Sequence, residues 1–400
     1  MTLPRDPATD ATSGDSWRFF SDPRIWVVLI AQTAFGLGWS VYLILPKFYA
    51  TELGADAASI GQVSATSGFA AVATIPVVIA LIDRVGRRPL LQLGCALLVL
   101  LSLGFARVER LDWHVAVLQA CTGSAFVLAF NASATLITDQ APAARLGQAI
   151  GVLGAANMAT NAISTIVGES IAQVAGWRAV FQLAAVLGAV GLAASFRIRE
   201  APRAGSARGG EVVEPPRALG PLLRVLAVAA LAGAPFSAMF TFQQPFALEL
   251  GAKQVAGFFA GFTLSSVAVR VFFGSLGDRL GRRRISCLAL LGYALMAVVT
   301  SKLQVGWLWA YGIGFGLAHG VFYPTLNALA VELSAARARG RVITLFNGAF
   351  NAGYGLSTLS WGWVAARRGY PTLFLLAAAV SLSSIALLLI GVKQTKEDQA

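Results

Sequence analysis

Long apolar stretches separated by polar segments follow one another from residue 25 to residue 391 of the 400-residue chain. Each stretch is about 20 residues long, which is the length that lets an α-helix cross a bilayer. The strict alternation of apolar and polar residues that marks a membrane β-barrel is absent from the sequence. The pattern predicts twelve membrane-spanning helices, at residues 25–49, 60–82, 89–106, 113–138, 148–172, 177–196, 221–248, 255–277, 285–301, 306–331, 342–364 and 370–391.

These predicted helices form two groups of six, and a charged string occurs at the same place in each group. The string DRVGRR at 83–88 returns as DRLGRR at 278–283, about half the chain later. We therefore expect an all-α polytopic membrane protein with two pseudo-symmetric six-helix bundles. Its predicted parts are a flexible tail (1–23), an N-terminal bundle (24–197), a linker rich in Arg, Pro and Gly (198–219), a C-terminal bundle (220–392) and a second tail (393–400).

The positive charges of the chain lie mainly on alternate turns. Of 31 Lys and Arg residues, 22 fall in the tails, the linker and the turns on one side, eight fall in the opposite turns, and Arg270 lies inside a stretch. Lys and Arg favour the cytoplasmic side of a membrane, so we expect both termini there. The net charge of +12 is then a signal of topology, with the lipid bilayer as partner and no nucleic acid.

The composition also excludes several chemistries. Hydrophobic residues make up 56% of the chain and charged residues 12%, with a mean hydropathy of +0.69. The three cysteines lie in apolar stretches without metal-ligand spacing, and the two histidines lie in separate stretches. A phosphate-binding loop of the Gly-x4-Gly-Lys-Ser/Thr type is absent. We expect no cofactor, no metal and no enzymatic activity, and nothing requires more than a monomer.

Twelve spans, a six-plus-six division and a doubled Asp-Arg-x-Gly-Arg-Arg turn resemble the major facilitator superfamily of secondary transporters, and efflux-type bacterial members in particular. This resemblance implies a location in the plasma (bacterial inner) membrane. The second copy keeps the family's preceding Gly-x-Leu-x-Asp pattern at 274–278, whereas the first copy has Ile79 in place of the glycine. The resemblance implies a cytoplasmic latch between the bundles, formed by Asp83, Arg84, Gly86, Arg87, Arg88, Asp139, Asp278, Arg279, Gly281, Arg282, Arg283 and Glu332. The alternative is that these residues only anchor the topology.

Two motifs of proton-driven exporters in this family are weak in this chain. Gln119 stands where such exporters usually have an Arg, four residues before Gly123. The segment 164–169 stands where they often show Gly-Pro-x-x-Gly-Gly, and only Gly168 matches. Drug and proton exchange is therefore less strongly indicated than membership of the family.

Ionisable groups inside membrane spans are costly and mark functional sites. Glu169 and His319 are the candidate proton carriers, because a carboxylate in apolar surroundings favours its protonated form and His titrates near neutral pH. Alternatively, Glu169 is an interfacial residue near water or Arg178, and His319 is bonded to a neighbour. Arg270 could bind an anionic substrate or serve as a structural partner.

Neutral polar residues are frequent in the predicted helices. Some should join helices by hydrogen bonds, and the rest should line a polar cavity with few charges. Together with Arg270 and His319, the candidate cavity residues are Gln32, Gln119, Asn131, Asn157, Asn161, Gln243, Gln244, Tyr323, Asn327, Asn347, Asn351 and Tyr354.

The sequence thus favours a secondary transporter that works by alternating access and exports a small organic compound in exchange for protons. Uptake of a small organic acid or another metabolite by symport is the alternative, favoured by Arg270 and by the weak exporter motifs. A membrane sensor or scaffold without transport is a third possibility from another class.

Overall fold

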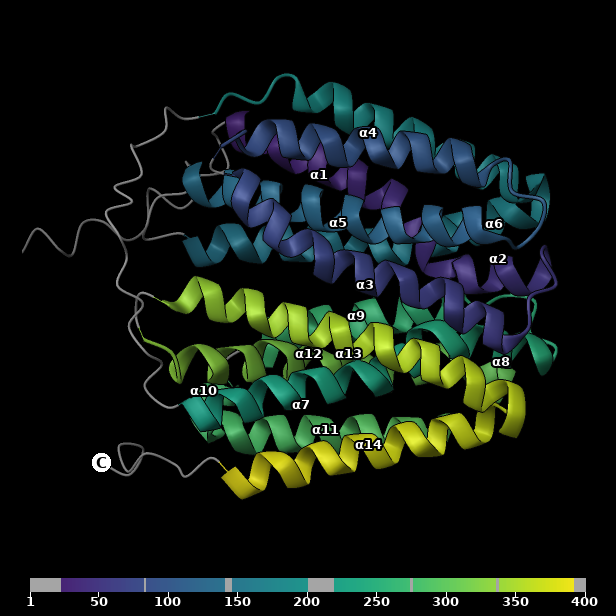
Figure 1. Ribbon diagram of the computed structural model, residues 1–400, viewed down its shortest axis with the longest axis vertical. Coiled ribbons are helices and arrows are strands. Elements are labelled where there is room, and N and C mark those ends of the chain that lie inside the picture. Colours follow the sequence, from purple (N-terminus) through teal and green to yellow (C-terminus); the bar gives the residue numbers. More distant parts are fainter. Residues whose placement is uncertain are drawn as a thin grey trace, which may run out of the picture.

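The computed structural model describes residues 23–82, 84–140, 146–200, 219–273, 276–335 and 338–391, and all regular structure in these ranges is helical. The predicted tails and nearly all of the predicted linker lie outside the described residues. Figure 1 shows the helices from the first part of the chain on one side and those from the second part on the other. We call residues 23–200 the N half and residues 219–391 the C half.

The N half contains the helices α1 (Pro23–Trp39), η1 (Ser40–Ile44), α2 (Leu45–Thr51), α3 (Ala57–Ile82), α4 (Arg87–Phe105), α5 (Trp113–Gln140) and α6 (Leu146–Ser195). The C half contains α7 (Leu219–Ser237), η3 (Ala238–Phe242), α8 (Gln243–Glu249), α9 (Ala256–Phe273), α10 (Leu276–Leu280), α11 (Arg282–Thr300), η4 (Val305–Trp307), α12 (Leu308–Glu332), α13 (Arg339–Arg368) and α14 (Tyr370–Gly391). In the N half α1 packs on α6, and both α3 and α4 pack on α5. In the C half α9 packs on α12, and α13 packs on α7.

The predicted twelve spans are all present as helices. Within the described ranges, nine helical runs are long and apolar enough to cross a membrane. Two of them, Gly151–Ser195 and Arg339–Ile390, reverse at Gly176 (φ 79°) and Gly369 (φ 80°), so each holds two helices. Only glycine adopts such positive φ readily. This explains why, in each half, the fifth span can turn so tightly into the sixth. The remaining span is α12, with 25 residues.

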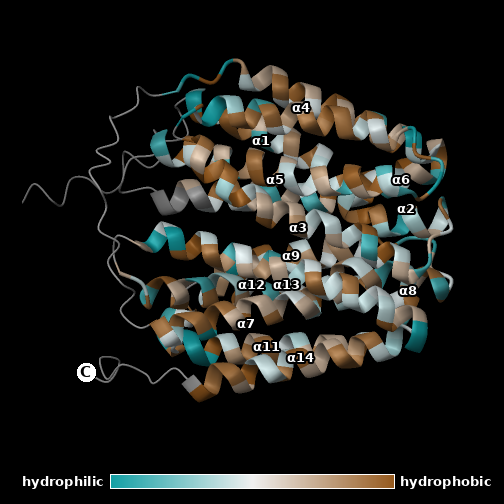
Figure 2. Ribbon diagram, viewed as in Figure 1, coloured by the Kyte–Doolittle hydropathy of each residue, from teal (hydrophilic) through white to brown (hydrophobic). Residues whose placement is uncertain are grey.

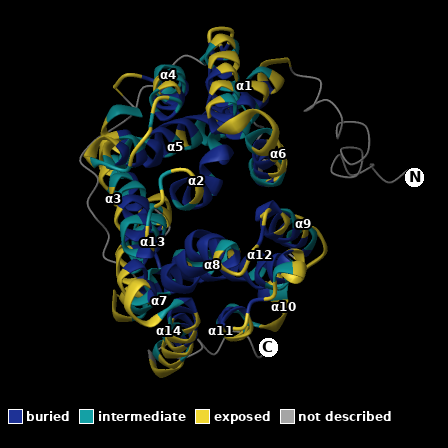
Figure 3. Cartoon of the chain, turned by 90° about the vertical axis from the view of Figure 1, so that its right-hand side faces the viewer, coloured by how far each residue is buried: buried dark blue, intermediate teal, exposed yellow. Residues whose placement is uncertain are grey.

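Apolar side chains cover the outside of the bundle as a membrane protein requires. Leu100, Leu264 and Leu288 are 65%, 70% and 61% exposed. Figure 2 shows hydrophobic residues along the length of the helices, with hydrophilic residues gathered near the two ends. Seen along the helices, exposed residues lie on the outer side of the ring and buried residues on the inner side (Figure 3). These exposed apolar faces fit a lipid environment.

The two ends of the bundle are chemically different. One end, called the motif end, carries both copies of the charged string, with α10 at the left of Figure 1. The opposite end, called the gate end, carries α2 and α8 at the right of that view. The two halves contact each other through α3 with α13, α6 with α9, and α2 with α8.

Glycines allow the closest of these contacts, between α3 and α13. A Cβ atom added at Gly61 would lie 2.8 Å from the Gly362 Cα and 2.8 Å from the Thr358 carbonyl oxygen. About two helical turns further along α3, a Cβ at Gly68 would lie 3.1 Å from the Gly355 Cα. A Cβ at Gly348, closer to the motif end, would meet only an Ile75 side chain at 3.9 Å. The α3–α13 contact is therefore tightest at the gate end.

We predict that Gly61→Val forces α3 and α13 apart at the gate end, because overpacking against backbone atoms cannot be relieved by a rotamer change. The test uses a protein without its native cysteines that carries Thr358→Cys. Its reaction rate with an impermeant maleimide should be at least about tenfold higher with Gly61→Val than with the native Gly61. Gly306→Val is the matched control, since nothing lies within 4 Å of a Cβ at that position. An unchanged labelling rate in a folded Gly61→Val protein would contradict the close contact.

Candidate functional site

At the gate end a carboxylate of the N half lies at the start of a helix of the C half. Glu169, on α6, is only 1% exposed. Its Oε1 accepts a hydrogen bond from the Val255 N–H (2.8 Å), and its Oε2 accepts from the Ala256 N–H (2.7 Å). These amide groups lie at the N-terminus of α9, where backbone N–H groups have no partner within the helix and the helix dipole favours negative charge. The contact therefore joins the halves by charge-assisted hydrogen bonds.

Lys47, on α2, completes this contact. Its ammonium group forms an ion pair with Glu169 and donates a hydrogen bond to the Lys253 carbonyl oxygen (2.7 Å). Lys47 is 6% exposed, so both charges of the pair are buried. Both belong to the N half, while Lys253, Val255 and the other backbone groups that they bind belong to the C half. We call Lys47, Glu169 and residues 253–256 the gate cluster.

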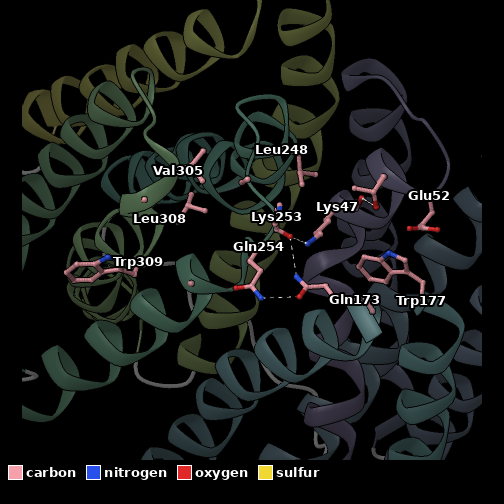
Figure 4. Close-up of a pocket in the computed structure, with 15 residues that line it drawn as sticks. Lys47, Glu52, Gln173, Trp177, Leu248, Lys253, Gln254, Val305, Leu308 and Trp309 are labelled. Atoms are coloured by element: carbon pink, nitrogen blue, oxygen red, sulfur yellow. Dashed lines mark hydrogen bonds between the residues drawn. The ribbon is translucent and has the colours of Figure 1, made fainter. Parts of the chain in front are cut away.

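A groove of about 800 Å³ lies beside the gate cluster and is lined by both halves. Figure 4 shows Lys47, Gln173, Lys253 and Gln254 converging there, with Trp177 and Trp309 further apart. The Gln173 amide donates to the Lys253 carbonyl oxygen (3.4 Å) and accepts from the Gln254 amide (3.2 Å). The groove is thus lined by Lys47 of the buried ion pair, by the neutral amides of Gln173 and Gln254, and by the charged residues Glu52 and Lys253.

Asp56, an exposed carboxyl at the gate end that lies just before α3, has a lowered pKa. Hydrogen bonds from Ser59, including its N–H at 2.9 Å, lower the pKa of Asp56 below the usual range. Asp56 thereby caps the start of α3 and keeps its charge at mildly acidic pH.

His319 and Arg270 lie together in the C half, away from the gate cluster. His319, on α12, is 8% exposed, and its Nδ1 is hydrogen-bonded to the Tyr293 hydroxyl. Arg270, on α9, interacts electrostatically with His319, Tyr293 and Tyr323. The two candidates thus belong to one cluster, whereas Glu169 belongs to another.

Most neutral polar candidates make hydrogen bonds between or within helices. Gln32 accepts from Ser133, Gln119 from Tyr49, Asn161 from Ser40 and Asn347 from Tyr323; Tyr354 bonds to Thr241. Asn131 and Asn351 donate to carbonyl oxygens four residues earlier. Gln244 donates to the Leu43 carbonyl oxygen across the halves, at 2.8 Å. Asn157 and Asn327 are half-buried, and the buried Gln243 amide has no partner among the described residues.

The charged turns at the motif end pair within each half. Arg87 lies 3.1 Å from the Asp139 carboxylate, and Arg282 lies 2.8 Å from Asp278 and 3.2 Å from Glu332. The Arg88 backbone N–H donates to the Glu200 carboxylate, and its side chain donates to the Ile198 carbonyl oxygen (3.3 Å). The Arg283 side chain donates to the Leu389 carbonyl oxygen, while Arg84 and Arg279 are exposed. Gly86 and Gly281 adopt φ of 108° and 90°, and Asp83 lies outside the described residues. The bonds between the halves that a latch requires therefore stay a prediction.

The sequence reasoning missed the partners of Glu169. The alternative that Glu169 is an interfacial residue near water or Arg178 does not fit the structure, because Glu169 is buried and paired with Lys47. A signal existed, since Lys47 lies inside the predicted span 25–49 and we counted it only as a turn charge. The amides of residues 255 and 256 carry no sequence signal.

The fold and the gate cluster define an integral membrane protein of two helical bundles that meet at one end. Comparison with known sequences supports this class: the sequence profile of the Major Facilitator Superfamily matches residues 28–264 and again residues 227–400. The chain belongs to that superfamily, whose members are transporters and not enzymes.

Individual relatives agree with this assignment. Multi-drug resistance efflux pump PmrA of Streptococcus pneumoniae is 26% identical over 364 residues, covering 84% of this chain and 88% of the relative. Multidrug resistance protein MdtG of Salmonella paratyphi A is 28% identical over 325 residues, covering 76% and 77%. The nucleoside transporter NupG has the same fold, with a TM-score of 0.80 at 13% identity over 92% of this chain and 99% of that one.

We predict that Lys47 and Glu169 stabilise the protein as a unit. Lys47→Met should lower the free energy of unfolding in mixed micelles by about 3 kcal/mol, because it leaves a buried carboxylate without its counter-charge. Lys47→Met combined with Glu169→Gln should cost less than the sum of the two single changes, by about 1 kcal/mol or more. Glu249→Gln, an exposed carboxylate on α8, should have little effect. Additive single effects would contradict the coupling.

Proposed function

We propose that this protein exports a small organic compound by alternating access, in exchange for protons, across the bacterial inner membrane. The motif end would face the cytoplasm and the gate end the outside, in line with the excess of Lys and Arg in the tails, the linker and the motif-end turns. The relatives PmrA and MdtG are named as multidrug efflux and resistance proteins, which supports export.

The single observation that carries this proposal is the gate cluster. Glu169 must be ionised to pair with Lys47 and to accept hydrogen bonds from the start of α9. Closure of the gate end therefore favours the carboxylate, and by linkage protonation of Glu169 favours the open gate. A proton would bind from the outside while the gate is open and would leave once the gate has closed. This difference in proton affinity between the two states is what an antiporter requires.

Vesicles with an acidic interior test this proposal. Proteoliposomes should accumulate at least one of three fluorescent probes, a cation (ethidium), a neutral dye (Nile red) or an anion (carboxyfluorescein). Glu169→Gln should reduce this accumulation at least about tenfold, because a neutral amide cannot change charge between the two states. Probe exchange without a pH gradient should continue in the variant.

Glu249→Gln is the control, since it removes an exposed carboxylate at the same end of the molecule. Accumulation driven only by an acidic exterior would overturn export and favour uptake by symport. Wild-type accumulation and pH dependence in Glu169→Gln would overturn the role of this carboxylate. Failure to move any probe under any gradient would favour a sensor without transport.

A further inference from the structure

The membrane-spanning part of the chain has a charge imbalance that the gate cluster does not explain. Glu169 is the only Asp or Glu that the sequence places inside an apolar stretch, and Lys47 and α9 already bind it. Arg270 lies about two turns inside the predicted span 255–277, eight residues before Asp278. No carboxylate pairs with Arg270 among the described residues. An ionised group held in such a place is costly unless a counter-charge arrives.

Hydrogen bonding also leaves Arg270 under-satisfied. Its buried Nε has no partner among the described residues. One terminal nitrogen donates to the Met158 thioether sulfur at 3.0 Å, and thioether sulfur is only a weak acceptor. Met158 belongs to α6 of the N half, so this contact places the guanidinium between the two halves. A carboxylate could instead accept two parallel hydrogen bonds from the planar guanidinium.

Aromatic rings form the surroundings of Arg270 in the C half. Arg270 interacts electrostatically with His319 and Tyr323. The His319 ring lies 4.8 Å from the Phe236 ring and 5.6 Å from the Tyr323 ring, and Tyr323 lies 5.4 Å from Phe350. Phe236 and Tyr323 are only half-buried. Such rings pack well against another flat ring in offset or edge-to-face arrangements.

We propose that the transported compounds are organic anions in which a carboxylate is attached to a planar aromatic ring. The carboxylate would bind Arg270, and the ring would pack against Phe236 and Tyr323 between the two halves. Cations would be disfavoured, because they would approach the half-buried positive charge of Arg270 without a free carboxylate nearby. The proposal rests on the proposed transport function, but it concerns binding and holds for either direction of transport.

Equilibrium binding to the purified full-length protein tests this substrate class with three probes that share one ring. Naphthoate should bind at least about tenfold more tightly than the neutral naphthamide, and naphthylmethylammonium should bind most weakly, as measured by calorimetry. Arg270→Gln should weaken naphthoate binding at least about tenfold and leave naphthamide binding within about twofold. Arg270→Lys should fall between, because it keeps the charge and loses the two-pronged geometry.

Arg107→Gln is the matched control, because it removes an exposed arginine in a turn far from the cluster. Equal binding of naphthoate and naphthamide by the wild type would overturn the proposal. An unchanged preference in folded Arg270→Gln or Arg270→Lys protein would do the same. Proton-driven export of ethidium without a preference for anions would overturn the proposed substrate class but would support the proposed export function. Anion binding through Arg270 without proton-driven export would support the proposed substrate class and overturn the proposed export function.

Discussion

The arrangement of the whole molecule depends on one buried carboxylate that meets the start of a helix from the other half. Burial of a charge is tolerated only when its partners replace the water that it loses. Glu169 finds three such partners, a counter-charge from its own half and two amide donors from the opposite half. The contact is strong only while the carboxylate is ionised, so a proton can weaken it. This single group is the basis of the coupling that we propose between proton binding and closure of the gate end.

The halves share a helical plan but differ in the chemistry of their inner sides. In both halves the first span departs from α-helical geometry at the same place, as a 3₁₀ turn at Ser40–Ile44 and a π turn at Ala238–Phe242. Such turns often mark functional positions, and the adjacent Gln244 bonds to Leu43 across the halves.

The N half supplies both side chains of the gate ion pair, while the C half supplies Arg270 and an aromatic wall. One half therefore carries the proposed proton site and the other the proposed substrate site.

The architecture could be predicted from the sequence because lipid imposes simple rules on it. Apolar stretches of fixed length predicted the twelve helices, and the repeated string at 83–88 and 278–283 predicted two related bundles. Glu169 and Arg270 could also be singled out, because charge inside an apolar stretch is rare. The partners of Glu169 could not, since the amides of residues 255 and 256 depend on the folded backbone. Likewise, the grouping of Arg270 with His319 and Tyr323 depends on the angles at which helices cross.

A distance measurement across the gate end tests the coupling of proton to closure most directly. Spin labels at Glu52 and Leu250 lie on exposed positions of opposite halves. At neutral pH the wild type should show a single short distance, and acidification should populate a longer one as Glu169 is protonated, while Asp56 with its lowered pKa keeps its charge. Glu169→Gln should show the longer distance at both pH values. A distance distribution that responds neither to pH nor to Glu169→Gln would contradict the account.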